Sequence, residues 1–279
     1  MGHDFRHAMC NEAFKDFDFR ESCRILRNAG YTGIEIAPFT LAEDPLQISP
    51  HQRAEFKHIM SGEGLTFVGL HWIMVSPAGL HVTTPDDEVR ARSWRHIHNL
   101  IDLCADLGPG GVMVFGSPKQ RASTGGLTRE QATRNFVSGL AEAAPHAEDR
   151  GVVILAEALP SAQCDVMQSL AEAVCIVKEI GSPAVQTMFD THNAVEELEN
   201  HAVLVDRCFD LIRHVHVNEM DGSHPGQRDY DFRPLLTVLK DRGYSGWISL
   251  EVFDFAPGAE TIARQSIDFL KQVTERLPQ

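Results

Sequence analysis

Positive charge, closely spaced cysteines and long apolar runs are all scarce in this sequence. Its 279 residues include 39 acidic and 25 basic side chains, which give a formal net charge of −14. A field of that sign repels phosphate backbones and anionic lipid surfaces, so we expect no nucleic acid and no membrane among its partners. The longest apolar stretches, such as residues 152–155, are far shorter than the roughly 20 residues that a membrane helix needs.

The six cysteines are scattered along the chain and form no CxxC pair. Disulfide frameworks and zinc knuckles usually show tight cysteine spacing, so we expect buried thiols of a reducing compartment. The first seven residues, MGHDFRH, are polar and lack the apolar core of a secretory signal. These features predict a soluble, cytoplasmic protein, and its 43% hydrophobic residues suffice for a sizeable core.

Short runs rich in Val and Ile, each followed by a polar loop and an amphipathic stretch, indicate alternating strands and helices. Two helix starts are signalled by N-cap spacing, at Asp18 with Glu21 and at Thr128 with Gln131. A third helical pattern stops at Gly243. The eight predicted strands span residues 6–12, 33–37, 66–73, 111–115, 152–157, 185–190, 214–218 and 247–251.

Eight strands alternating with eight helices is the count of a closed (β/α)8 TIM barrel, an α/β fold, here as a single domain over residues 1–279. The rival is a doubly wound open sheet, which usually has a Gly-rich turn after its first strand. Residues 10–14, CNEAF, contain no glycine, so the barrel is favoured.

Four consecutive predicted strands each end an apolar run with a carboxylate or an imidazole. These residues are Glu157, Asp190, His216 and Glu251. One acidic residue at a strand end is commonly the solvated start of a loop. Four at the same barrel mouth would bury several charges, and a cation is their natural partner. Three oxygen donors and one imidazole suit Mn²⁺, Mg²⁺, Co²⁺ or Zn²⁺, and the absence of thiolate argues against a structural zinc site.

Several motifs resemble the sugar isomerase/epimerase superfamily of xylose isomerase-like barrels, which includes ketose 3-epimerases, hydroxypyruvate isomerase and inosose-metabolising enzymes. They are VVILAEALP, MFDTHNAVEE, HVHVNEMDG with the following PGQRDYDF, and GYSGWISLEVFD, and the likeness extends to GYTGIEIAPF and GVMVFGSPKQR. The resemblance covers nearly the whole chain. It implies one divalent metal, with Mn²⁺ as the first expectation, on Glu157, Asp190, His216 and Glu251.

The resemblance also implies a reaction, in which a small ketose or related polyol ketone is isomerised or epimerised through an enediolate. Glu157 and Glu251 would act as acid and base on opposite faces of the substrate, while Asp190 and His216 would be metal ligands only. The expected partner is a small-molecule sugar. Barrels of this family often self-associate, so a homo-oligomer is left open.

Substrate contacts are less firmly implied because the sequence departs from the ketose epimerase pattern. Gly222 stands where the epimerases have Arg, and Gln163 stands where Glu is common. Arg228 could replace the missing guanidinium. His214, which faces the same side as His216, could support that ligand. The expected substrate contacts are His192, Arg228, His71, Gln163, Trp72 and Glu12.

Three other functions stay open at this point. Proton abstraction next to a carbonyl can end in elimination, which would make the protein a metal-dependent lyase or dehydratase. A relative of endonuclease IV would need several zinc ions and a basic groove, which the net charge of −14 disfavours. A non-catalytic sugar-binding barrel would not need two glutamates beside a metal. Lys119 and Arg121 are expected in a solvated loop.

Overall fold

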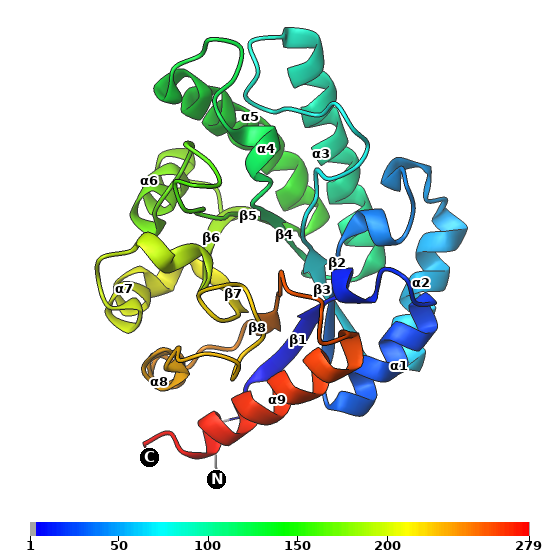
Figure 1. The fold of residues 1–279 in the computed structure, drawn as a ribbon. Helices are drawn as coiled ribbons and strands as arrows, with labels where there is room; N and C mark the ends of the chain where they lie inside the picture. The colour runs from blue at the N-terminus through cyan, green and yellow to red at the C-terminus, as the bar shows by residue number, and fades with distance from the viewer. Residues whose placement is uncertain (1–3, 279) are drawn as a thin grey trace.

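The computed structural model describes residues 4–278, which form a closed barrel of eight parallel strands paired in chain order (Figure 1). Strand β8 pairs with β1 and closes the barrel. The strands are β1 (Arg6–Cys10), β2 (Gly33–Ile36), β3 (Thr66–Leu70), β4 (Val112–Phe115), β5 (Val153–Ala156), β6 (Val185–Asp190), β7 (Ile212–Val217) and β8 (Trp247–Leu250). The barrel predicted from the sequence is confirmed.

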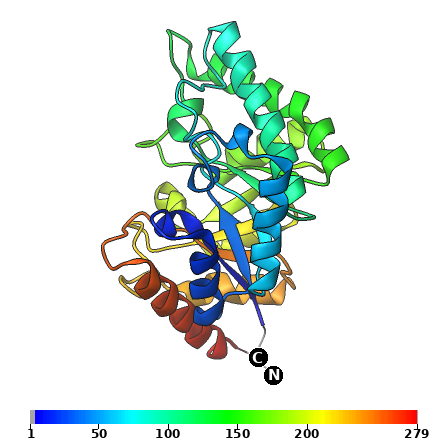
Figure 2. The same ribbon diagram turned by 90° about the vertical axis from the view of Figure 1, so that its right-hand side faces the viewer.

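Helices surround the barrel, as Figures 1 and 2 show. They are α1 (Phe19–Ala29), α2 (Pro50–Gly62), α3 (Asp87–Leu107), α4 (Pro118–Arg121), α5 (Arg129–Arg150), α6 (Leu170–Ile180), α7 (His201–Cys208), α8 (Phe232–Asp241) and α9 (Ala259–Glu275). Within residues 4–278, none of them is both long and apolar enough to cross a membrane.

The helix starts predicted from capping signals are confirmed. The Asp18 carboxylate accepts hydrogen bonds from the backbone N–H groups of Arg20 and Glu21, and α1 begins directly after it. Thr128 and Gln131 form a complete capping box at the start of α5. These short-range contacts satisfy backbone donors that would otherwise lack a partner, which is why the signal can be read locally.

Most predicted strands were too long at their carboxyl ends. Strand β1 stops at Cys10 instead of residue 12, because a 3-10 turn (Asn11–Phe14) follows at once. Strand β3 stops at Leu70 instead of residue 73. The chain stays largely buried past these strands because it then turns over the barrel mouth, as Asn11, Glu12 and His71 show. Glu157 and Glu251 therefore lie one residue beyond β5 and β8.

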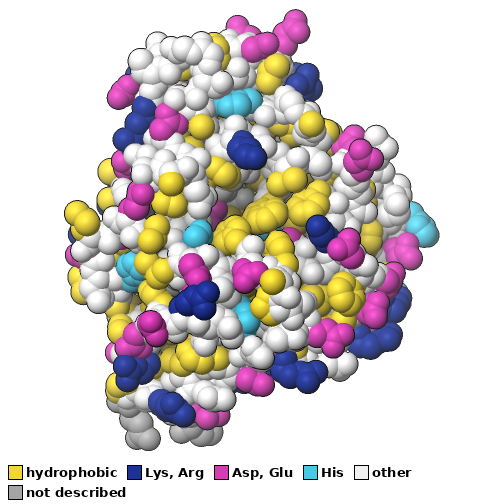
Figure 3. Space-filling model, viewed as in Figure 1, with side chains coloured by type: hydrophobic (Ala, Val, Ile, Leu, Met, Phe, Trp, Pro, Cys, Tyr) yellow, Lys and Arg dark blue, Asp and Glu magenta, His cyan; other side chains and the backbone are white. Residues whose placement is uncertain are grey.

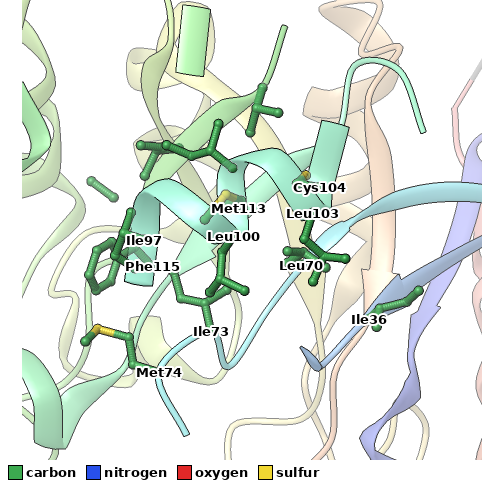
Figure 4. Close-up of a cluster of buried hydrophobic side chains, with 14 of the residues drawn as sticks. Ile36, Leu70, Ile73, Met74, Ile97, Leu100, Leu103, Cys104, Met113 and Phe115 are labelled. Atoms are coloured by element: carbon green, nitrogen blue, oxygen red, sulfur yellow. The ribbon is translucent and has the colours of Figure 1, made fainter. Parts of the chain in front are cut away.

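The main core fills the space between the barrel and its helices. Figure 4 shows one part of it, where Ile97, Leu100 and Leu103 of α3 face Met113 and Phe115 of β4. Each fully buried side chain of this size contributes about 1.5–3 kcal/mol relative to an exposed one. The interior of the barrel has a separate small apolar cluster, formed by Val114, Leu155 and Met188.

Candidate active site

Charged side chains lie directly above the apolar cluster inside the barrel, because alternate residues of a strand point to the same side. Glu157 lies two residues beyond Leu155, and Asp190 two residues beyond Met188, so each pair points into the barrel. The sequence thus places polar groups directly above the apolar floor. The four predicted ligands meet here: one donor atom each from Glu157, Asp190, His216 and Glu251 lies within 4.8 Å of the others, and all four residues are buried.

We call these four residues the quartet. The imidazole Nδ1 of His216 lies 3.1 Å from Glu251 Oε2 and 3.5 Å from Asp190 Oδ2. Asn193 holds two of the carboxylates, because its side-chain amide donates to Glu157 Oε1 at 3.1 Å and its backbone N–H donates to Asp190 Oδ1 at 2.9 Å. Asp190 Oδ2 is buried and accepts no hydrogen bond from residues 4–278.

Negative charge is in excess at the quartet. Burial raises the pKa of Glu157 well above its ordinary value, and the nearby Glu251 and Asp190 carboxylates raise it further. Burial also raises the pKa of Glu251, and the adjacent His216 only partly offsets this. Three carboxylates share one imidazole, and one oxygen has no donor. A divalent cation would supply the missing positive charge, so the donor set fits a metal.

The described residues contain two further groups of metal-binding side chains, Cys10 with Glu12 and His71, and Cys10 with Glu35 and His216. Their carboxylates already have partners. Glu12 Oε2 lies 2.7 Å from His71 Nε2, and Glu35 Oε2 lies 2.8 Å from His214 Nε2. Each carboxylate in these groups therefore has an imidazole partner of its own, whereas the three carboxylates of the quartet share the one imidazole of His216.

A cavity of about 430 Å³ opens above Glu157 and Glu251. Trp72 and Phe253 form an apolar wall, with ring centroids 6.1 Å apart and nearly parallel planes. Figure 3 shows that this face of the molecule is hollowed near its centre and that hydrophobic side chains gather along the hollow. The cavity thus combines a charged floor with a broad apolar wall. The remaining lining residues are Val75, Gly116, Ser117, Pro118, Lys119, Gln120, Leu159, Gln163 and Asn193.

Gly116 follows β4 and leaves room for the carboxylate of Glu157. A methyl group at this position would overlap Glu157 Oε2. Sequence patterns did not single out Gly116, because the requirement comes from a residue on the next strand.

The predicted substrate contacts fall into different places. Trp72 and Gln163 line the cavity, and His192 Nε2 lies 3.5 Å from the Gln163 side-chain amide. Glu12 and His71 are buried, pair with each other and are not among the cavity's lining residues within the described chain.

Arg228 lies on an exposed loop and binds Asp221 at 2.7 Å, outside this cavity. Its guanidinium therefore does not line the cavity, where it was expected to replace the Arg that is missing at Gly222. Asp221 instead holds it at the protein surface.

The expectation of a solvated loop was wrong for Arg121, which is fully buried. Its Nη1 donates to the backbone oxygens of Phe115 and Glu157, each at 2.8 Å. These bonds tie the ends of β4 and β5 together beside the base candidate. The neighbouring Lys119 is exposed and lines the cavity. The two side chains are two residues apart in α4 and so lie on opposite sides of the helical turn, and the sequence does not indicate which of them turns inward.

Sequence reasoning also missed Asn193 and Phe253. Asn193 stands three residues after Asp190, where its amide reaches Glu157. Phe253 stands two residues after Glu251, so the strand period already implied that it faces the same way.

A family model described as a xylose isomerase-like TIM barrel matches residues 23–273 of the chain. The chain belongs to this family. Its sequence relatives include the L-ribulose 3-epimerase of Methylomonas sp. (strain DH-1), 26% identical over 228 residues, which are 81% of this chain and 75% of the relative. Another is the fructoselysine 3-epimerase of Shigella flexneri, 24% identical over 173 residues, or 60% of this chain. The match spans only 61% of that relative's length.

Among solved structures, a D-psicose 3-epimerase with D-tagatose from Clostridium cellulolyticum H10 superposes with a TM-score of 0.84 at 20% identity. The superposition covers 97% of this chain and 99% of the other. At this identity the likeness establishes the fold alone, and the resemblance seen in the motifs is confirmed by the family model.

Phe253 forms a wall at Gly222, the position at which the ketose epimerase pattern predicts Arg. The backbone φ of Gly222 is +81°, and a Cβ there would lie 2.9 Å from the Phe253 ring. Phe253 N–H donates to the Gly222 carbonyl at 2.8 Å. Phe253 therefore closes the space from which a side chain at residue 222 would reach the cavity.

Proposed function

We propose that this protein is a divalent-metal-dependent epimerase or isomerase of a ketose or a related small sugar. The observation that carries the proposal is that Glu157 and Glu251 belong to the quartet and also line the cavity. A site that only bound a ligand would not need two buried glutamates there. The names of the relatives, L-ribulose 3-epimerase and fructoselysine 3-epimerase, support sugar epimerisation.

The four quartet residues would hold the cation, for which Mn²⁺ is our first expectation. When bound, it would act as a Lewis acid that makes a proton beside the substrate carbonyl easier to remove. One glutamate removes this proton from one face of the carbon, and the other, which is protonated, donates a proton to the opposite face. The configuration at carbon inverts, and the number of protons on the substrate is unchanged. Glu157 and Glu251 exchange these duties with the direction of the reaction.

The surroundings of the two glutamates suit this work. Both carboxylates lie at the floor of the cavity, where a substrate carbon can reach them. The Asn193 amide binds Glu157 Oε1 and leaves Oε2 free above Gly116. Trp72 and Phe253 offer an apolar surface to the C–H face of a sugar and exclude water from it. His192 and Gln163 are the polar groups proposed to contact substrate hydroxyls.

A metal-dependent lyase or dehydratase is the second candidate. It would begin with the same proton abstraction and end with loss of a hydroxyl group from the neighbouring carbon. The observation in its favour is the altered substrate wall, where Phe253 packs over Gly222. A different wall can hold a substrate whose leaving group is aligned for elimination. An endonuclease IV-like function is disfavoured because the extra carboxylates, Glu12 and Glu35, are paired with imidazoles.

The test is proton exchange in D₂O, followed by NMR with Mn²⁺-loaded protein and a panel of free ketoses, ketose phosphates and inososes. NMR spectra are taken after the metal has been removed. We expect deuterium to enter one substrate next to its carbonyl, and EDTA to abolish the exchange. Exchange with inversion and no loss of water supports the epimerase. Loss of water from the same substrate supports the lyase, and no exchange with metal demonstrably bound contradicts both for the panel.

A further inference from the structure

Glu35 is a buried carboxylate that the proposed reaction does not use. It lies on β2 between Ile34 and Ile36 and has no exposed surface. The pairing of β2 with β3 shifts register between Ile34 and Glu35, an irregularity of the kind that re-aims side chains near active sites. This irregularity accompanies a Glu35 side chain that reaches histidines of β7 inside the barrel.

Two histidines of β7 contact this carboxylate. His214 Nε2 lies 2.8 Å from Glu35 Oε2, and His216 Nε2 lies 3.1 Å from Oε1 and 3.2 Å from Oε2. A carboxylate can only accept hydrogen bonds, so each of these ring nitrogens must carry the proton. His214 and His216 are two residues apart on one strand, which is why both rings reach the same acceptor.

The consequence for His216 concerns its other nitrogen. With the proton on Nε2, a neutral imidazole has its lone pair on Nδ1. That atom faces the quartet, 3.1 Å from Glu251 Oε2 and 3.5 Å from Asp190 Oδ2. The ring is therefore fixed in orientation by Glu35 on one side and offers a ligand atom on the other.

We propose that Glu35 is a positioning residue for the metal centre, which holds His216 as the Nε2–H tautomer so that Nδ1 binds the cation. Glu35 itself does not touch the metal. His214 anchors Glu35 from the second side and keeps its carboxylate in place. The inference rests on the proposed function only in assuming that the quartet holds a divalent cation.

The competing arrangement is a cation on Cys10, Glu35 and His216, whose donor atoms also lie close together. Cys10 Sγ lies 3.9 Å from His216 Nε2. A cation there would need Nε2 without its proton and a thiolate at Cys10. The two arrangements therefore require opposite tautomers of His216, and this makes them separable by experiment.

The first experiment compares the Mn²⁺ affinity of the wild type, Glu35→Gln and Glu12→Gln by titration calorimetry against a competing chelator. Glu12 is the matched control, since it is a similarly buried carboxylate that pairs with His71. We expect Glu35→Gln to bind Mn²⁺ about 10–100-fold more weakly and Glu12→Gln to stay within a few-fold of the wild type. Equal affinity of Glu35→Gln and wild type would overturn the inference, as would an equal loss in both variants.

The second experiment needs no substitution and covers the case in which Glu35→Gln does not fold. In Zn²⁺-loaded wild type, ¹⁵N NMR of the His216 ring should show a proton on Nε2 and a metal bond at Nδ1. In Co²⁺-loaded wild type, the absorption spectrum should lack a thiolate-to-cobalt charge-transfer band. A metal bond at Nε2, or that band, would overturn the inference in favour of the Cys10 group.

The outcomes also separate this inference from the proposed function. Failure of every substrate to exchange protons, with metal bound through Nδ1, would contradict the epimerase and leave the role of Glu35 standing. Normal proton exchange by the wild type, together with unchanged Mn²⁺ affinity in Glu35→Gln, would support the epimerase and contradict the role of Glu35. A wild type that binds no divalent metal would overturn both.

Discussion

The two halves of the barrel mouth contain the same kinds of side chain in different proportions. The β5–β8 half has three carboxylates and one imidazole, with a cavity above Glu157 and Glu251. The β1–β3 half has two carboxylates, Glu12 and Glu35, which lie within 2.8 Å of imidazole nitrogens. The first half has more carboxylates than imidazoles, whereas each carboxylate of the second half has an imidazole partner.

This difference explains how neighbouring polar clusters can have separate roles. A buried carboxylate that has an imidazole partner of its own is stabilised within the protein. Three buried carboxylates that share one imidazole, as in the quartet, gain free energy when a cation arrives. The β1–β3 half can then support the other, as Glu35 does in contacting His216.

The largest effect is expected for Glu251→Gln, which removes a proton-transfer group and keeps the shape of the side chain. Turnover should fall by about 10²–10⁴-fold, since general acid–base groups contribute this much. Steady-state rates on the substrate found by deuterium exchange measure it. The metal-free variant should unfold at the same temperature as the wild type or higher, because one of the crowded carboxylates is neutralised. An unaffected rate would remove Glu251 from the reaction.

The opposite result for stability is expected in the β1–β3 half. His71→Leu leaves the Glu12 carboxylate buried without its partner, which should lower the free energy of unfolding by about 3–5 kcal/mol. Urea unfolding followed by circular dichroism measures the change. His71→Gln is the control, because its amide can still donate to Glu12, and it should lose less. Equal stability of His71→Leu and wild type would show that the two halves do not differ in this way.

The contribution of His71 to the free energy of unfolding should also depend on pH. Burial lowers the pKa of His71, but the Glu12 carboxylate 2.7 Å away favours the charged ring, and the pKa lies well above its ordinary value of 6.5. A raised pKa in the folded state stabilises the protein fully below pH 6.5 and loses this contribution as the pH rises through the folded value. The stability difference between wild type and His71→Gln should therefore shrink in alkaline buffer. A difference that grows with pH would contradict an ion pair.

A smaller effect on the reaction is expected from Gly116→Ala, whose added methyl group displaces the Glu157 carboxylate. A shift of this group by about 1 Å should slow turnover by about 10²-fold. Gly62→Ala is the matched control, since a Cβ at that position meets no described atom within 4 Å. Rates and melting temperatures of both variants are compared. Equal rates would mean that Glu157 tolerates displacement.

The smallest effect is stabilisation by metal. Mn²⁺ at ten times its dissociation constant should add about 1.4 kcal/mol to the free energy of unfolding and raise the melting temperature by a few degrees. EDTA should reverse the shift. Asp190→Asn should reduce the response at the same Mn²⁺ concentration, while His71→Gln should retain it. A rise in melting temperature with Mn²⁺ that requires His71 and not Asp190 would place the cation in the β1–β3 half and contradict the quartet as its site.

Local patterns predicted a large part of this structure. The order and number of strands, the start of α1 at Asp18 and the start of α5 at Thr128 all depend on residues close together in the chain. The quartet could be chosen as well, because a parallel barrel brings every strand end to one rim and needs no knowledge of side-chain contacts. The roles given to its members remain proposals.

Contacts between distant residues could not be predicted in this way. Glu35 lies 179 residues from His214 and 181 from His216, and nothing near it in the sequence indicates two imidazole partners. The sequence around Arg121 predicted a solvated loop, yet its side chain is buried and donates to the backbone oxygen of Glu157, 36 residues away.

The sequence by itself therefore determined the barrel, its family and the four residues that can hold a cation, because periodicity, caps and strand ends are local properties. Only the tertiary structure decided which carboxylates are paired with imidazoles, that Arg121 is buried while Lys119 is exposed, and how Phe253 packs against Gly222. These depend on how far strands shift in register and how side chains share a confined interior. Such distances are fixed only when the barrel closes.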